Sequence, residues 1–112
     1  MFKNNKFKIG ELPSDIIKKI NEDFVDDSDK VIDLFNGYLL NSHEKGYERV
    51  IRCIIFLAKK SVKGIEKGIQ QANIDSRDVM FWAEYVELES DTPKRVRDFK
   101  KPFNKNDLNI FD

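Results

Sequence analysis

The chain has few of the residues from which metal, redox and covalent sites are built. It contains one cysteine, Cys53, and one histidine, His43, so it cannot form an internal disulfide and lacks the usual zinc-ligand spacings. Cys53 falls within an apolar run, where a free thiol behaves as a small hydrophobe, and His43 falls in a polar turn. There is no glycine-rich phosphate loop. We therefore expect no catalytic residues, no metal and no cofactor, and predict that the chain is not an enzyme.

Long apolar runs are also absent. No stretch approaches the length of a membrane span, and the first residues lack the apolar core of a signal peptide, which predicts a cytoplasmic protein without membrane contact. Charged residues are abundant, but 20 Lys and Arg balance 20 Asp and Glu, which disfavours a general nucleic-acid coat. The charge is unevenly distributed, with a net charge of −3 over residues 1–44, +5 over 45–77 and −2 over 78–112. Surfaces of opposite sign favour a charged partner.

Apolar residues recur at helical spacing along most of the chain, which predicts an all-α fold. We expect an antiparallel array of about five helices in a single domain, at about residues 14–24, 28–40, 46–60, 61–72 and 77–88. A short arm (residues 1–12) precedes them. A C-terminal segment (residues 92–112) follows and is expected to pack back onto the core.

The expected helix ends carry capping residues. Ser14 is placed to accept from the first free N–H groups, and Asp15 lies at the positive end of the helix dipole. A turn at residues 73–78, capped by Asp75 or Ser76, is expected to separate the fourth helix from the fifth.

The third segment, residues 46–60, is the most apolar part of the chain. Between Val50 and Ala58 only Arg52 is polar. A strand is the alternative here because β-branched residues are frequent, but the length without a turn signal favours a helix. A helix that is apolar on nearly all sides is typical of a central position. In the following segment, Gly64 and Gly68 stand four residues apart and permit the close approach of another helix.

Six acidic residues lie within twelve positions at the junction of the first two expected helices: Glu22, Asp23, Asp26, Asp27, Asp29 and Asp33. Three roles are open for them. They can cap the second helix and offset its dipole, bind a metal, or imitate a phosphate backbone towards a basic partner. The spacing does not match a calcium loop, and no glycine is present for its tight bend.

A basic stripe follows on the third segment, with an aromatic residue in its gap: Lys45, Arg49, Arg52, Phe56, Lys59 and Lys63. Cations around a ring are typical of a nucleic-acid groove. The same pattern arises when the helix is central, the ring is covered by another element and the long lysine stems extend outward. The neutral total charge favours the second interpretation, so nucleic-acid binding is the alternative function.

Near the C-terminus, Val96, Phe99 and Phe103 stand at positions i, i+3 and i+7. Burying each contributes about 1.5–3 kcal/mol, which predicts that this segment folds back over the fifth helix. Arg95 and Arg97 then reach acidic residues near the end of that helix. Exposed pairs contribute at most about 1 kcal/mol, so apolar contact is expected to hold the segment. A docking peptide for another protein is the alternative.

Three motifs carry a resemblance. They are Arg49-x-x-Arg52-Cys53, then Arg77-Asp78-Val79 followed by Ala83-Glu84-Tyr85, then Arg95-x-Arg97-Asp98-Phe99 followed by Pro102-Phe103. Over residues 45–103 the chain resembles a group of short bacterial proteins of unknown function that share these motifs. Small proteins of this sort are similar to immunity partners encoded beside toxins, including those of contact-dependent inhibition systems. The resemblance implies a cytoplasmic binding protein and no catalytic residues.

These observations together predict a protein-binding immunity protein. It would neutralise a cognate nuclease-type toxin by covering the active site or substrate groove with acidic side chains, since opposite fields accelerate encounter. The predicted partner-binding residues form a first group and a second acidic edge: Asp23, Asp26, Asp27, Asp29 and Asp33, then Glu84, Glu87 and Glu89.

Overall fold

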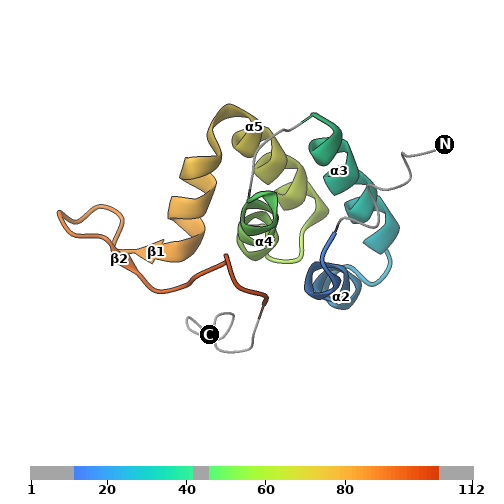
Figure 1. Ribbon diagram of the computed structural model, residues 1–112, viewed down its shortest axis with the longest axis horizontal. Coiled ribbons are helices and arrows are strands. Elements are labelled where there is room, and N and C mark those ends of the chain that lie inside the picture. The colour runs from blue at the N-terminus through green and yellow to red at the C-terminus, as the bar shows by residue number, and fades with distance from the viewer. Residues whose placement is uncertain (1–11, 42–45, 104–112) are drawn as a thin grey trace.

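The computed structural model describes residues 12–41 and 46–103, which form four helices and a small hairpin (Figure 1). The elements are α2 (Ser14–Asp23), α3 (Ser28–Asn41), α4 (Tyr47–Ala58), α5 (Val62–Glu84), β1 (Tyr85–Val86) and β2 (Lys94–Arg95). The two strands pair antiparallel, with Tyr85 opposite Arg95. The mostly helical class is confirmed for these residues. The expected arm of residues 1–12 lies outside them except for its last residue.

Helix α4 is seen nearly end-on in Figure 1, with α5 passing over it and with α2 and α3 on the side away from the hairpin. The apolar run is helical, as expected, and seven of the twelve residues of α4 are buried. Left-handed backbone at Gly46 (φ 79°) and Lys59 (φ 51°) bounds the helix, so it ends two residues before the expected position. This burial matches the mostly apolar sequence of the segment and its central position.

Helix α5 is where the predicted number of helices differs from the structure. The expected fourth and fifth helices form one helical stretch that bends at Asp75, whose backbone is extended (φ −161°, ψ 103°). The Asp75 carboxylate accepts a hydrogen bond from the Arg77 N–H at 3.0 Å, which caps the second arm. The expected turn of six residues is therefore reduced to a single extended residue, and the two arms meet at an apex (Figure 1).

Two glycines allow the first arm of α5 to pack closely on α4, as expected from their spacing. A Cβ at Gly64 would lie 2.8 Å from the Ala58 Cα, and one at Gly68 would lie 2.6 Å from Cγ2 of Ile54. Both distances are shorter than any ordinary carbon–carbon contact. The missing side chains thus set the spacing between the two helices.

Helix α2 begins differently from the prediction. Pro13, not Ser14, occupies the N-cap, and no side chain caps this end. The Pro13 carbonyl instead accepts hydrogen bonds from the N–H groups of Ile16 and Ile17, both at 3.1 Å. Proline has its φ fixed near the value required here, so Ser14 becomes the first residue of the helix rather than its cap.

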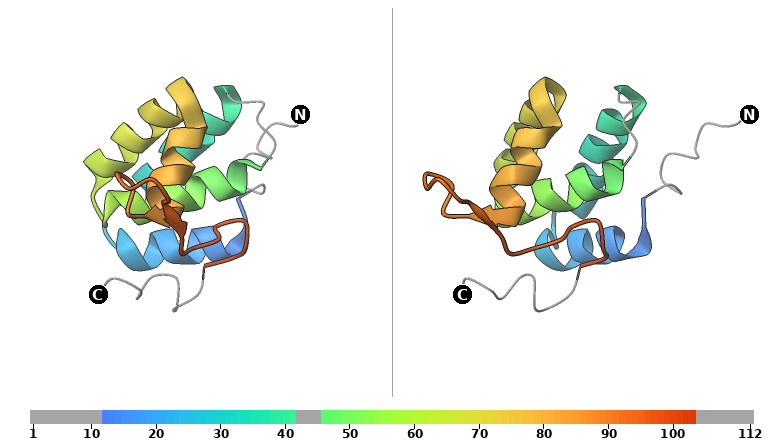
Figure 2. Two further views of the ribbon diagram at one scale, coloured as in Figure 1. Left: turned by 90° about the vertical axis from the view of Figure 1, so that its left-hand side faces the viewer. Right: turned by 60° about the vertical axis from the view of Figure 1, so that its left-hand side comes forward.

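The chain after the hairpin folds back across the helices, as Figure 2 shows. Phe99 is completely buried, and Phe103 is partly buried against the same core. Val96 is only half-buried. Trp82, on the second arm of α5, is 45% exposed. The second arm of α5 turns Val79 and Ala83 inward. These two residues are four positions apart and therefore lie on the same face of the helix.

Candidate functional site

The first candidate surface is the turn between α2 and α3. Four carboxylates are exposed there, and we call this group the acidic corner: Asp26, Asp27, Asp29 and Asp33. Phe24 is buried and fixes the turn, because its carbonyl accepts from the Asp27 N–H at 2.9 Å. None of the four carboxylates forms an ion pair with another residue in the described ranges. Among the described residues, no ion pair therefore neutralises the four carboxylates of the corner.

Asp23 does not share this exposure. Its side chain is 10% exposed and forms an ion pair with Lys19 at 3.3 Å, one helical turn earlier. Val25, by contrast, is 75% exposed between the acidic residues of the turn. The corner thus combines charge with one apolar side chain, while Asp23 stabilises the end of α2.

The three residues of the second predicted acidic edge do not lie on one surface. Glu87 and Glu89 lie on the exposed loop of the hairpin, where Glu87 has a left-handed backbone (φ 57°) and lies 3.8 Å from Lys94. Glu84 has no exposed surface, so a partner cannot reach it in this structure. The expectation that Glu84 forms part of a surface edge is wrong because the C-terminal segment covers it.

Glu84 instead lies at the centre of a buried polar network that we call the clasp. Its carboxylate accepts two hydrogen bonds from the guanidinium of Arg49, one of them at 3.0 Å from Nε, and one at 2.9 Å from the Phe99 N–H. Arg95 approaches the same carboxylate to 3.5 Å. One buried charge therefore joins α4, the end of α5 and the C-terminal segment.

Arg52 forms the second half of the clasp. Its guanidinium donates to both carboxylate oxygens of Asp15, at 2.9 and 3.0 Å, and to the Phe99 carbonyl at 3.0 Å. Asp15 also accepts from the Phe103 N–H at 3.1 Å. Asp15, which was expected to offset the dipole of α2, thus pairs with a buried arginine of α4 and holds the C-terminal segment. A fork-to-fork pair of this kind is both strong and directional.

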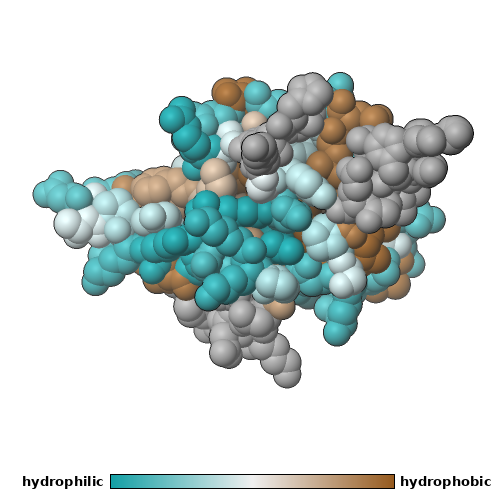
Figure 3. Space-filling model, in the orientation of Figure 1, coloured by the Kyte–Doolittle hydropathy of each residue, from teal (hydrophilic) through white to brown (hydrophobic). Residues whose placement is uncertain are grey.

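The apolar part of the clasp lies beside these charges. The rings of Phe56 and Phe103 contact Phe99, with centroids 5.5 and 5.8 Å away. Arg97 is buried, lies 4.2 Å over the Phe56 ring and donates to the Ala83 carbonyl at 2.9 Å. Charge and apolar contact therefore hold the segment together, and Figure 3 shows its outer surface as a hydrophilic band.

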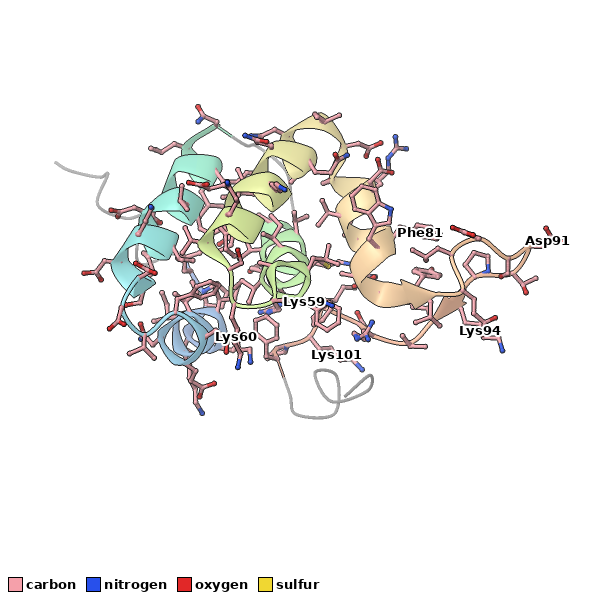
Figure 4. All side chains as sticks on the ribbon, turned by 180° about the vertical axis from the view of Figure 1, so that it is seen from behind. Lys59, Lys60, Phe81, Asp91, Lys94 and Lys101 are labelled. Atoms are coloured by element: carbon pink, nitrogen blue, oxygen red, sulfur yellow. The ribbon has the colours of Figure 1, made fainter. Side chains whose placement is uncertain are left out.

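The basic stripe of the third segment is not a continuous surface. Arg49 and Arg52 pair with carboxylates inside the clasp, and Phe56 is covered by Phe99 and Arg97. Lys59 and Lys63 are exposed beyond the end of α4, and Figure 4 shows Lys59 beside Lys60 there. Lys45 lies outside the described residues. The ring of Phe56 is therefore covered within the fold and is not exposed for stacking with a nucleic-acid base.

Protonation in the clasp follows from these contacts. Burial opposes ionisation of Asp15, yet the hydrogen bonds from Arg52 and from the Phe103 N–H outweigh it, so the pKa of Asp15 lies below its ordinary value of 3.8. Hydrogen bonding to Glu84 raises the pKa of Arg49. Burial, together with the nearby Glu84 charge, raises the pKa of Cys53 well above its ordinary value. The thiol therefore stays protonated and is a poor nucleophile.

Other kinds of site find little support in the part of the chain that the structure describes. No group of three or more His, Cys, Asp or Glu side chains is arranged there to hold a metal ion. Within residues 12–41 and 46–103, no helix combines the length and the apolar character needed to cross a membrane.

The three motifs that carry the resemblance meet in the clasp, through Arg49, Arg52, Glu84, Arg97 and Phe99. The sequence contained one signal of this arrangement, because a lone arginine in a buried run requires a partner. The sequence does not indicate which acidic residue is the partner of that arginine. Comparison with models of known protein families, with curated proteins and with solved structures gives no match.

Proposed function

We propose that this chain is an immunity protein that binds a nuclease-type toxin through the acidic corner and its exposed apolar residue. The observation that carries the proposal is a group of four exposed carboxylates that form no ion pair with the residues the structure describes, together with Val25, which is 75% exposed among them. An exposed apolar side chain surrounded by charge is the composition expected of a binding surface, with an apolar centre and a polar rim. The hairpin acids Glu87 and Glu89 are a second, separate negative surface.

The chemistry of a nuclease fits such a surface. A groove that binds a polyanionic substrate is lined with Lys and Arg, and carboxylates presented at a turn can occupy the places of phosphates. Complementary fields of this kind raise the association rate by orders of magnitude at low salt. The clasp supports the proposal indirectly, since it uses Arg49, Arg52 and Phe56 within the fold, where they are not presented to a nucleic acid.

The test is protection of cells against the toxin encoded beside this chain. The double variant Asp26→Lys/Asp27→Lys reverses two charges of the corner and should abolish protection. A matched control, Glu66→Lys/Asp91→Lys, makes the same change at exposed acids on other elements and should protect as well as the wild type. Exposed substitutions shift stability by only about 0.5 kcal/mol, so both variants should melt close to the wild type.

The outcomes separate two questions. Equal protection by the corner variant and its control would show that the corner is not the contact surface. Loss of protection in the control alone would favour the hairpin and α5 instead. Inhibition of the purified toxin's nucleic-acid cleavage, measured at low and high salt, tests the substrate-groove part of the proposal, because inhibition should weaken as salt rises.

A further inference from the structure

A pocket of about 340 Å³ opens beside the clasp, between α4, the second arm of α5 and the hairpin. Its volume lies at the small end of the range of about 300–1,000 Å³ found for ligand sites. The described residues that line it are Arg49, Arg77, Met80, Phe81, Glu84, Tyr85 and Pro93. None of them belongs to the acidic corner, so an inference about the pocket does not depend on the proposed function.

The apolar wall of the pocket suits a flat ring. Phe81 and Tyr85 stand one helical turn apart, with ring centroids 5.2 Å apart and planes tilted by 34°. Met80 and Pro93 complete the wall, and all four side chains are partly buried. Figure 4 shows Phe81 on the side of α5 that faces the hairpin. Aromatic rings stack at this spacing in offset or tilted geometry, so a ligand ring would find a matching surface here.

The polar groups of the pocket favour an anion. The oxygens of Glu84 already accept from Arg49 and from the Phe99 N–H. The side chains of Arg49 and Arg77 each donate through Nε and Nη2, and neither Nη1 has a hydrogen-bond partner among the described residues. Arg77 pairs with Asp75 at 3.0 Å, but its side chain is 85% exposed, and such pairs are weak enough to exchange. Two guanidinium groups therefore have donors available for a carboxylate.

We propose that this pocket binds an aromatic carboxylate. The ring lies against Phe81 and Tyr85, and the carboxylate accepts from Arg77 and Arg49. A free aromatic acid and the C-terminal aromatic residue of a peptide share this chemistry. The experiment distinguishes these two sources.

The test is a titration of the ¹⁵N-labelled chain, followed by amide chemical shifts, with four probes: phenylacetate, phenylacetamide, the peptide Gly-Gly-Phe and its C-terminal amide. Saturable shifts at Phe81 and Tyr85 are expected for the two carboxylates. The two amides should bind about ten-fold more weakly, because a charged hydrogen bond is lost. Tighter binding of the peptide than of phenylacetate assigns the ligand to a peptide C-terminus, and the reverse assigns it to a small acid.

One variant and one matched control complete the test. Arg77→Gln removes an exposed guanidinium without touching the clasp and should weaken phenylacetate about ten-fold. Lys67→Gln removes the same charge from an exposed site on the first arm of α5 and should leave the affinity unchanged. The proposal is overturned if no probe gives saturable shifts at millimolar concentration, if acid and amide bind equally, or if the two variants behave alike.

Discussion

Replacing Glu84 with Gln tests whether a buried charge holds the C-terminal segment. The carboxylate has no exposed surface and lies between Arg49, Arg95 and the Phe99 N–H. Gln keeps the shape of the side chain and an oxygen that accepts from Phe99. It removes the charge, so the guanidinium of Arg49 loses its counter-ion in a partly buried position.

The expected loss is large for a single substitution. Removing one partner of a buried ion pair costs about 3–5 kcal/mol, and because the Arg49 side chain retains 24% exposure we expect about 3 kcal/mol. With an unfolding entropy of about 2.1 cal/mol/K per residue, that loss lowers the Tm of a chain of this length by about 13 °C. Small domains are stable by about 5–15 kcal/mol in total, so the variant should still fold.

Urea denaturation followed by circular dichroism measures this loss. Glu87→Gln is the matched control, because Glu87 is half-exposed and lies 3.8 Å from Lys94. That control should change the free energy of unfolding by less than about 1 kcal/mol. In the double variant Arg49→Met/Glu84→Gln, the loss should be smaller than the sum of the two single losses, because neither charge remains unpaired. A Glu84→Gln loss no larger than that of the control would refute the reasoning about the clasp.

Three further predictions concern other parts of the core. The pKa of Asp15 is lowered in the folded state. Its contribution to the free energy of unfolding is therefore fully present above its ordinary pKa of 3.8 and is lost as the pH falls through the lower folded pKa. The stability difference between the wild type and Asp15→Asn, from urea curves, should be constant at neutral pH and shrink below pH 3.8; a difference that grows with acid would contradict this. Gly68→Ala should destabilise by about 1–3 kcal/mol through overpacking against Ile54, whereas Gly37→Ala, with nothing within 4 Å of its Cβ, should stabilise by up to about 1 kcal/mol; equal signs in thermal melts would refute the close packing. The buried Cys53 thiol should react with a thiol reagent only at the rate of unfolding, and fast labelling of the native chain would count against its burial.

Local pattern in the sequence determined most of the secondary structure. The apolar run from Val50 to Ala58 is helical and buried, and the glycines at 64 and 68 face α4. The return of Phe99 into the core was also predictable, because an aromatic residue left in water forgoes its burial energy. The acidic corner was predictable for a different reason. Its members are neighbours in the chain, so a single turn brings them together.

Tertiary structure alone decided which charges are surface and which are core. Arg49 and Glu84 are 35 positions apart, and Arg52 and Asp15 are 37 apart, so no local spacing links either pair. From composition alone, these four residues would be expected at the surface as charges exposed to solvent. The fold instead buries Arg52 and Glu84, and both ion pairs hold the C-terminal segment. The physical reason is that an ion pair in the interior depends on distance through space, which the chain's periodicity does not specify, while helix formation depends on neighbours one turn away.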